Sequence, residues 1–127
     1  MNLVAVITAL AVLEYVAVML LTGRARAQFG VAAPATTGHP EFERYYRVQQ
    51  NTIEQLIVFI PAVFLFANYA SPRIAALLGI VFIVGRILYA RGYIADPAKR
   101  GTGFIIGFVA NMILLLGGLI GATLASF

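Results

Sequence analysis

The sequence predicts an all-helical integral membrane protein, a four-helix up-down bundle formed by a single domain over residues 1–127. Of the residues, 61% are hydrophobic and only 11% are charged, whereas a soluble domain usually carries about 25% charged residues. The apolar residues gather in four long runs, and a helix needs about 20 of them to cross the hydrocarbon of a bilayer. None of the runs alternates strictly between apolar and polar residues, so helices rather than a closed barrel satisfy the backbone in lipid.

The expected spans lie at residues 3–21, 46–69, 73–93 and 103–125. The first run lacks a basic start and contains Glu14 in its middle, so we interpret it as a retained helix rather than a signal peptide. The second begins with polar turns, the third contains Arg86 and Arg91, and the fourth has no charge. Glycines four residues apart predict close helix packing in the fourth run: Gly103 and Gly107, and Gly117 and Gly121.

The three connections differ in length. Residues 22–50 form one long polar segment with several glycines and prolines, which we expect to be mainly loop. Ser71 and Pro72 predict a tight turn, with Pro72 in the first turn of the third helix. Asp96 and Pro97 mark the third connection.

An up-down bundle brings the first and third connections to one face of the membrane. All charged residues except Glu14 and Arg73 lie toward that face. Because basic residues are enriched on the cytoplasmic side, we expect this face to be cytoplasmic, with both termini across the membrane. The same rule accounts for the net charge of +4, so nucleic acid is not an expected partner.

Two polar stripes run from this face into the bilayer. The residues of the first stripe have the spacing i, i+4, i+7 on the second helix, and those of the second stripe have the spacing i, i+3, i+7 on the third helix. The residues of each stripe therefore lie on one side of their helix. The stripes consist of Arg47, Asn51 and Glu54, and of Arg86, Tyr89 and Tyr93. A charge at the bilayer centre costs about 2.5 to 3.5 kcal/mol, so these side chains are expected to face the protein interior at the same depth.

The stripes allow a structural and a functional interpretation. As a structural element, Glu54 and Arg86 would form a buried ion pair that holds two helices in register. The whole set instead favours a binding pocket, because guanidinium groups bind carboxylates bidentately, Glu54 could hold an amine, and phenols could stabilise an anion. A phosphate, a dicarboxylate and a peptide all remain possible ligands. The chain has no cysteine, so any reacting sulfur must come with a substrate.

The segment from Thr36 to Glu54 contains the pattern E-F-E-R-x-x-R-x-x-x-N-x-x-E. A second pattern, G-R-I-L-Y-A-R-G-Y, runs from Gly85 to Tyr93 and is followed by D-P-A-K-R, which ends at Arg100. Together they strongly resemble the signature of the membrane-associated proteins in eicosanoid and glutathione metabolism, the family of microsomal glutathione transferases and leukotriene C4 synthase. The resemblance extends from about Arg26 into the fourth helix.

This resemblance implies a homotrimer of four-helix subunits that binds glutathione between neighbouring subunits, near one membrane face. The residues implied to bind glutathione are Arg26, Arg47, Gln49, Asn51, Glu54, Tyr89 and Tyr93. Arg100 is implied to stabilise the glutathione thiolate, as the catalytic residue. Arg86 lies in the same motif, and we expect it, like Glu14, to have a structural or supporting role. No metal is expected.

Three positions depart from the family pattern. Gln55 stands where leukotriene C4 synthase has a ligand-binding tyrosine, and Ala27 stands where that enzyme has a second arginine. Both differences weigh against leukotriene synthesis. Pro61 lies deeper in the second helix than the family proline, so the shape of the groove for the hydrophobic substrate is expected to differ.

The expected function is conjugation of glutathione to hydrophobic electrophiles, with reduction of lipid hydroperoxides as a possible second activity. The protein would be a multi-pass protein of a bacterial inner membrane or a membrane of the endoplasmic reticulum type. Two alternatives stay open. One is a non-catalytic scaffold that binds glutathione or lipid, and the other is a proton-coupled exporter of the small multidrug-resistance type that uses Glu14. His39, the sole histidine, has no companion ligands nearby in the sequence.

Overall fold

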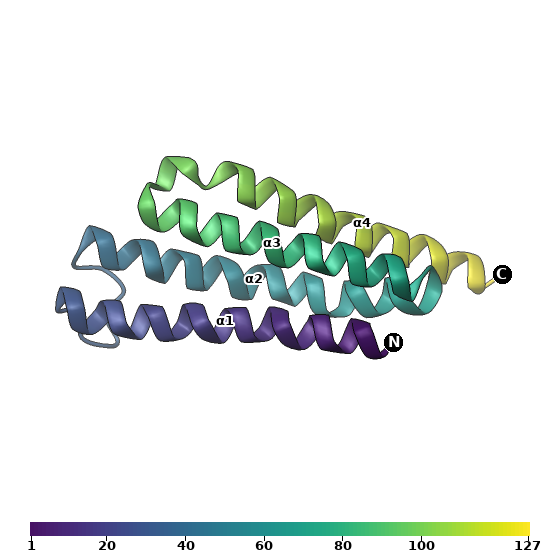
Figure 1. Ribbon diagram of the computed structural model, residues 1–127, viewed down its shortest axis with the longest axis horizontal. Helices are drawn as coiled ribbons and strands as arrows, with labels where there is room; N and C mark the ends of the chain where they lie inside the picture. Colours follow the sequence, from purple (N-terminus) through teal and green to yellow (C-terminus); the bar gives the residue numbers. More distant parts are fainter.

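The computed structural model describes residues 1–127 and consists of four long helices and one short one. They are α1 (Asn2–Phe29), α2 (Pro40–Tyr69), α3 (Pro72–Ala95), the 3-10 helix η1 (Pro97–Lys99) and α4 (Gly101–Ala125). The long helices lie side by side and alternate in direction, so both termini are at the same end of the bundle (Figure 1). This is the predicted up-down four-helix bundle.

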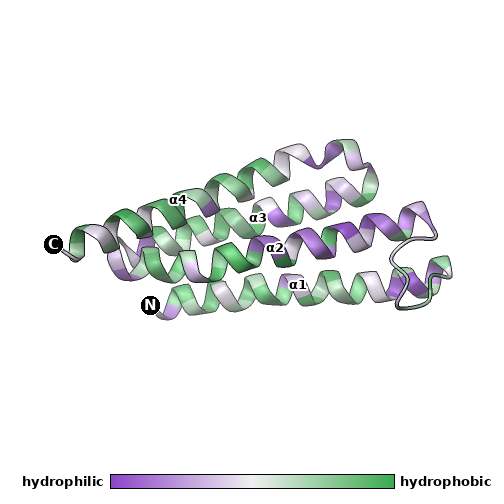
Figure 2. Cartoon of the chain, turned by 180° about the vertical axis from the view of Figure 1, so that it is seen from behind, coloured by the Kyte–Doolittle hydropathy of each residue, from purple (hydrophilic) through white to green (hydrophobic).

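Polar residues are concentrated at the end opposite the termini. Figure 2 shows apolar residues along most of each helix and hydrophilic residues near the α1–α2 loop and the α3–α4 turn. We call the half of the bundle nearest these two connections the polar end, and the half nearest Met1 and Phe127 the terminal end. All four long helices are long and apolar enough to cross a membrane.

The first connection is shorter than the sequence predicted. Instead of a mainly irregular segment over 22–50, α1 continues to Phe29 and α2 begins at Pro40, which leaves a loop over 30–39. Gly30 ends α1 in the left-handed conformation with φ 68°, which glycine adopts without steric cost. The polar helix ends persist because they pack together through a small buried cluster of Ala25, Val31 and Phe42.

The N-termini of α2 and α3 are capped by side chains. His39 Nδ1 accepts the Glu41 N–H at 3.1 Å before α2. Ser71 Oγ accepts the Ile74 N–H at 3.2 Å before α3, with Pro72 at the start of the helix, as the sequence predicted. Such caps satisfy backbone donors that have no partner within the helix.

The core of the terminal end is aromatic and closely packed. The rings of Phe59 and Phe82 stack with their centroids 4.1 Å apart, and both side chains are almost completely buried. Small residues let the helices approach each other at both ends of the bundle. At the terminal end a Cβ atom at Gly121 would collide with the Tyr69 carbonyl. At the polar end one at Gly85 would lie 2.6 Å from the Gly107 backbone nitrogen, and one at Gly103 would collide with the backbone of Tyr89. The predicted close packing of α4 through its glycines is therefore confirmed.

Candidate functional site

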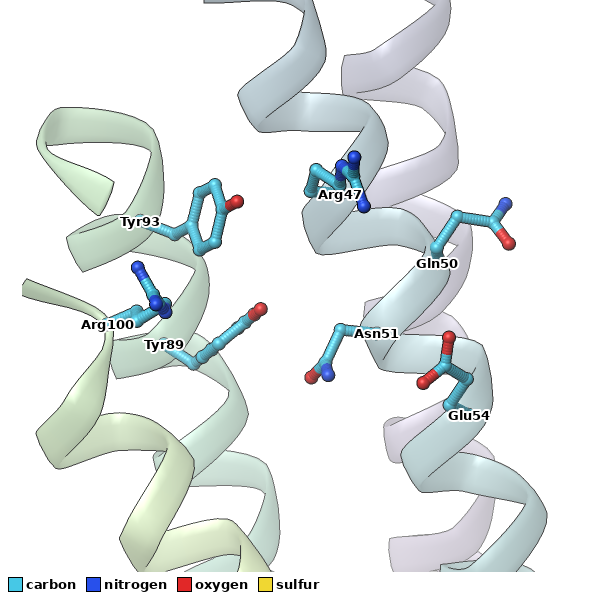
Figure 3. A pocket seen from close by; sticks show the side chains of 7 residues that line it. All are labelled: Arg47, Gln50, Asn51, Glu54, Tyr89, Tyr93 and Arg100. Atoms are coloured by element: carbon cyan, nitrogen blue, oxygen red, sulfur yellow. The ribbon is translucent and has the colours of Figure 1, made fainter. Parts of the chain in front are cut away.

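A cleft of about 340 Å³ opens at the polar end between α2 on one side and α3 with the start of α4 on the other (Figure 3). Its lining is mainly polar. The side chains around it are Arg47, Gln50, Asn51, Glu54, Tyr89, Tyr93 and Arg100. Six of these seven residues were predicted from the sequence, so the stripe on α2, the two tyrosines of the stripe on α3, and Arg100 do converge on one cleft, whereas Arg86 does not line it.

The α2 side of the cleft follows from helical spacing. Arg47, Asn51 and Glu54 recur at i, i+4 and i+7, and therefore lie on one side of the helix. Arg47 and Glu54 are exposed, whereas Asn51 is half-buried. The Oδ1 atom of Asn51 is buried and accepts no hydrogen bond within the chain. This free acceptor at the cleft can receive an N–H or O–H group from a ligand.

The opposite side carries two phenols and a guanidinium. Tyr89 and Tyr93 are four residues apart on α3, and their ring centroids lie 5.7 Å apart. Both side chains point from α3 toward α2 in Figure 3. Arg100 is brought to the cleft by the turn η1, where its Nη1 donates to the Pro97 carbonyl at 2.7 Å. Its guanidinium lies 5.8 Å from the centre of the Tyr93 ring.

Arg86 lies beneath the cleft and is only 2% exposed. Its Nη2 donates to Thr52 Oγ1 at 3.0 Å, and its guanidinium carbon lies 4.3 Å from the centre of the Tyr89 ring. The expected Glu54–Arg86 ion pair is therefore wrong. Glu54 is two residues beyond Thr52, and because each residue turns a helix by about 100°, the two side chains leave α2 on different sides. Arg86 reaches the inner side, and Glu54 faces outward.

Two residues implied to bind glutathione lie outside this cleft. Arg26 Nη1 donates to the Ala35 carbonyl at 2.7 Å and to the Val31 carbonyl at 3.4 Å, which holds the 30–39 loop against α1. Its guanidinium also covers the Phe42 ring at 4.8 Å. Gln49 is two residues from Arg47, so it lies on the opposite side of α2 from the cleft.

Sequence reasoning missed Gln50, which lines the cleft. Its spacing was the available signal, because Gln50 follows Arg47 by three residues and precedes Glu54 by four, which places it on the same side of α2. In Figure 3 the side chain of Gln50 points away from α3 and α4, and the Glu54 carboxylate extends along α2. One edge of the cleft is therefore formed by α2 alone and is open within a single chain.

The chemistry of the cleft suits a small ligand with several ionised groups. Arg47 and Arg100 supply two positive charges, and Glu54 supplies one negative charge. Guanidinium groups bind carboxylates or phosphates through paired hydrogen bonds, and the carboxylate can bind an ammonium group. The two phenols can donate hydrogen bonds to a developing anion. A smaller space of about 210 Å³ adjoins the cleft and adds Phe104 as an apolar wall.

Comparison with known proteins gives consistent results. Residues 4–120 match the MAPEG family. A protein of Synechocystis sp. described as uncharacterized is 53% identical over 116 residues, covering 91% of this chain and 85% of that protein. Human microsomal glutathione S-transferase 2 is 42% identical over 101 residues, covering 79% of this chain and 69% of the human protein.

Bovine leukotriene C4 synthase is 37% identical over 98 residues, which cover 77% of this chain and 65% of that enzyme. The family match spans nearly all of the four helices that are long and apolar enough to cross a membrane. The resemblance found in the two motifs is thus confirmed over almost the whole chain. This chain is therefore an integral membrane protein of the MAPEG family.

Proposed function

We propose that this protein is a membrane-bound glutathione transferase that joins the glutathione thiolate to hydrophobic electrophiles. The observation that carries the proposal is the single cleft at the polar end in which two arginines, a carboxylate and two phenols meet, brought there by α2, α3 and the turn before α4. Glutathione has two carboxylates, an amine and a thiol, so each of its ionisable groups has a chemical partner there. The names of two relatives, a glutathione S-transferase and leukotriene C4 synthase, support this choice.

Binding of glutathione uses the α2 side of the cleft. Arg47 binds a carboxylate, Glu54 binds the amine, and the free Oδ1 of Asn51 accepts an N–H from the peptide backbone. Gln50 adds a neutral hydrogen bond at the open edge. These contacts orient the thiol toward Tyr89, Tyr93 and Arg100 on the opposite side (Figure 3).

Arg100 activates the thiol. A cysteine thiol has a pKa of about 8.5, so only a few per cent is ionised at pH 7. Lowering the pKa of the bound thiol by about two units requires about 2.7 kcal/mol of preferential stabilisation of the anion. A charge-assisted contact from Arg100, with a phenol hydrogen bond, is of this size. The thiol proton leaves to water, and the thiolate attacks the electrophilic carbon as the leaving group departs with its electron pair.

The electrophile approaches from the bilayer. The smaller space beside Tyr89 and Arg100 includes Phe104 on α4, and the rings of Phe104 and Phe108 stack farther along the same helix. An apolar compound dissolved in lipid can therefore reach the thiolate along α4 without crossing water. Lipid hydroperoxides are a second candidate substrate: the thiolate takes the terminal oxygen to give an alcohol, and a second glutathione then reduces the oxidised sulfur to the disulfide.

We also propose that the protein acts as a homotrimer, with the cleft at the cytoplasmic face of a bacterial inner membrane or a membrane of the endoplasmic reticulum type. The cleft is open at the edge formed by Gln50 and Glu54, where a second copy could complete it. Arg26 and Gln49 lie outside the cleft of their own chain, so in this proposal they bind glutathione in the cleft of a neighbouring subunit. Cross-linking of the protein in detergent tests this assembly. The proposal predicts cross-linked trimers, and the recovery of monomers alone would contradict it.

The decisive experiment is a turnover assay. Detergent-purified protein is mixed with glutathione and a chromogenic aryl halide, and adduct formation is measured against the uncatalysed rate. Turnover above that rate is expected. Glutathione binding without turnover would favour the non-catalytic scaffold, whereas proton-coupled dye efflux that is lost in Glu14→Gln would favour the exporter.

A further inference from the structure

A layer of polar side chains crosses the bundle below the cleft, and the proposed function does not use it. Each of the four long helices contributes to this polar layer, which consists of Glu14, Thr52, Gln55, Arg86 and Asn111. Arg86 and Asn111 are 2% and 1% exposed. Buried polar groups in a membrane helix are costly and require an explanation.

The hydrogen bonds of the polar layer leave several atoms unpaired. Arg86 donates to Thr52, and Asn111 Nδ2 donates to the Gln55 carbonyl at 3.2 Å. Both carboxylate oxygens of Glu14, the Nε of Arg86 and the Oδ1 of Asn111 are buried without a hydrogen-bond partner in the chain. A donor with positive charge and a carboxylate that lacks donors are thus buried in the same layer.

Helix packing brings these two groups to the same level of the bundle. Ile7 on α1 packs over Gly79 on α3, and α1 and α3 run in the same direction (Figure 1). Glu14 and Arg86 each follow these contact residues by seven positions, which is two helical turns, so they lie on the facing sides of the two helices. A buried guanidinium without a counter-ion is strongly destabilising, whereas a paired one is not. Glu14 is the acidic group of the polar layer, so it is the available counter-ion for Arg86.

The charge of Arg86 also reaches the cleft. Its guanidinium lies against the face of the Tyr89 ring, whose negative potential attracts a cation. The groups that act electrostatically on Tyr89 are Arg86 and Tyr93 from α3, Arg100 next to α4, and Glu54 from α2. Arg86 is therefore the charged group that acts on Tyr89 from the bundle interior.

We propose that Glu14 is the buried counter-ion of Arg86, and that this pair sets how much positive charge reaches the Tyr89 phenol and the thiolate bound in the cleft. Replacing both charges by apolar groups of similar volume would avoid the cost of burying them, which favours a role for the pair beyond stability. Glu14 and Arg86 act through Tyr89 and are positioning residues. The second half of the proposal rests on the proposed binding of glutathione.

The first test needs no glutathione. Thermal unfolding of the detergent-solubilised protein is compared for Glu14→Gln, Arg86→Gln and the double variant. Each single change is expected to lower the Tm, and the double variant to lower it by less than the sum, because the two residues are coupled. Glu41→Gln, an exposed carboxylate, serves as the control and should combine additively with Arg86→Gln. Additive losses for Glu14 and Arg86 would overturn the pairing.

The second test follows the ultraviolet absorbance of the bound glutathione thiolate against pH. Arg86→Gln removes positive charge near the thiolate. It is expected to raise the pH at which half of the bound glutathione is ionised by about one unit, which corresponds to a tenfold loss of thiolate at a pH below this midpoint. Glu14→Gln removes the charge that offsets Arg86, and is expected to lower the midpoint by a smaller amount. Arg86→Lys keeps the charge and should stay near the wild type. If Arg86→Gln does not fold, the midpoints of Arg86→Lys and Glu14→Gln are compared with that of the wild type, and only Glu14→Gln is expected to lower it.

Opposite shifts are the signature of a charge pair, because general damage to the packing would move both midpoints in the same direction. Shifts of the same sign, or an unchanged midpoint in Glu14→Gln, would overturn the proposal. A wild-type protein that neither binds glutathione nor forms a thiolate would refute the proposed function and the effect on the cleft. The Tm comparison would then still decide whether Glu14 pairs with Arg86.

Discussion

The two halves of the bundle are built differently. In the terminal half, apolar side chains fill the space between helices, as in the stacked pair of Phe59 and Phe82. In the polar half, Asn51 and Arg86 have unpaired polar atoms, and a cleft separates α2 from α3 and α4. Lipid offers no hydrophobic driving force between helices, so close packing must hold them together. The terminal half therefore supplies stability, and the polar half can retain costly polar groups for binding.

The largest expected effect is on the terminal half. Phe59→Ala should lower the free energy of unfolding by about 3 kcal/mol, because the packing against Phe82 is lost and a cavity remains. Thermal unfolding in detergent measures the loss, while glutathione affinity below the transition should be unchanged. Phe108→Ala, at a side chain that is 45% exposed, is the matched control and should have little effect. Similar Tm losses in both variants would contradict the division between the halves.

The next largest effect concerns the chemistry of the cleft. Arg100→Ala should reduce the thiolate population at pH 7 about 25-fold, from about three quarters to about 3% of the bound glutathione, because the pKa of the thiol returns from about 6.5 to about 8.5. Because the Arg100 side chain is exposed and bonds only to the nearby Pro97 carbonyl, the Tm should hardly change. The neighbouring exposed residue Lys99 provides the control Lys99→Ala. Equal thiolate absorbance in wild type and Arg100→Ala would remove Arg100 from this role.

A smaller effect is expected where the polar half is held together. Arg26→Ala should lower the free energy of unfolding by about 1.5 kcal/mol, since it removes charge-assisted hydrogen bonds to two loop carbonyls. Faster hydrogen exchange over residues 30–39 would accompany the loss. Arg24→Ala, at an exposed residue two positions earlier, is the control. A higher KM for glutathione with an unchanged Tm would instead place Arg26 at the ligand.

The smallest effect separates two adjacent glutamines. Gln50→Ala should raise the KM for glutathione about fivefold, because the loss of one neutral hydrogen bond costs about 1 kcal/mol of binding free energy. Gln49→Ala should also raise the KM for glutathione, but only through the neighbouring subunit of the proposed trimer, since Gln49 lies on the opposite side of α2 from the cleft of its own chain. An unchanged KM for Gln49→Ala in the same aryl halide assay would contradict a contribution from the neighbouring subunit.

Much of the fold followed from the sequence because lipid simplifies the problem. Long apolar runs must form helices, and the i, i+4, i+7 spacing alone placed Arg47, Asn51 and Glu54 on one side of α2. Helix extent was underestimated, since the polar turns of α1 and α2 are stabilised by the contacts of Ala25 and Phe42, which no local pattern reveals.

The site was predictable in its parts but not in its pairings. Arg86 could reach either Glu54 or Thr52 from its position on α3, and only the rotation of α2 decides that it bonds to Thr52. The bonds of Arg26 depend on the path of the 30–39 loop, which follows no helical period. Periodicity fixes which residues share a side, whereas partners depend on how the helices are rotated about their axes.

The contact between Gly103 and the Tyr89 backbone divides the wall of the site into a fixed part and an adjustable part. Any side chain at Gly103 would push α4 away and take the phenol out of register with α2. The next residue, Phe104, has its ring centroid 6.3 Å from that of Tyr89, but no such backbone constraint. Changes in the size of this ring would therefore alter which electrophiles are accepted without disturbing how the thiol is activated, which makes Phe104 the natural position for redesigning selectivity.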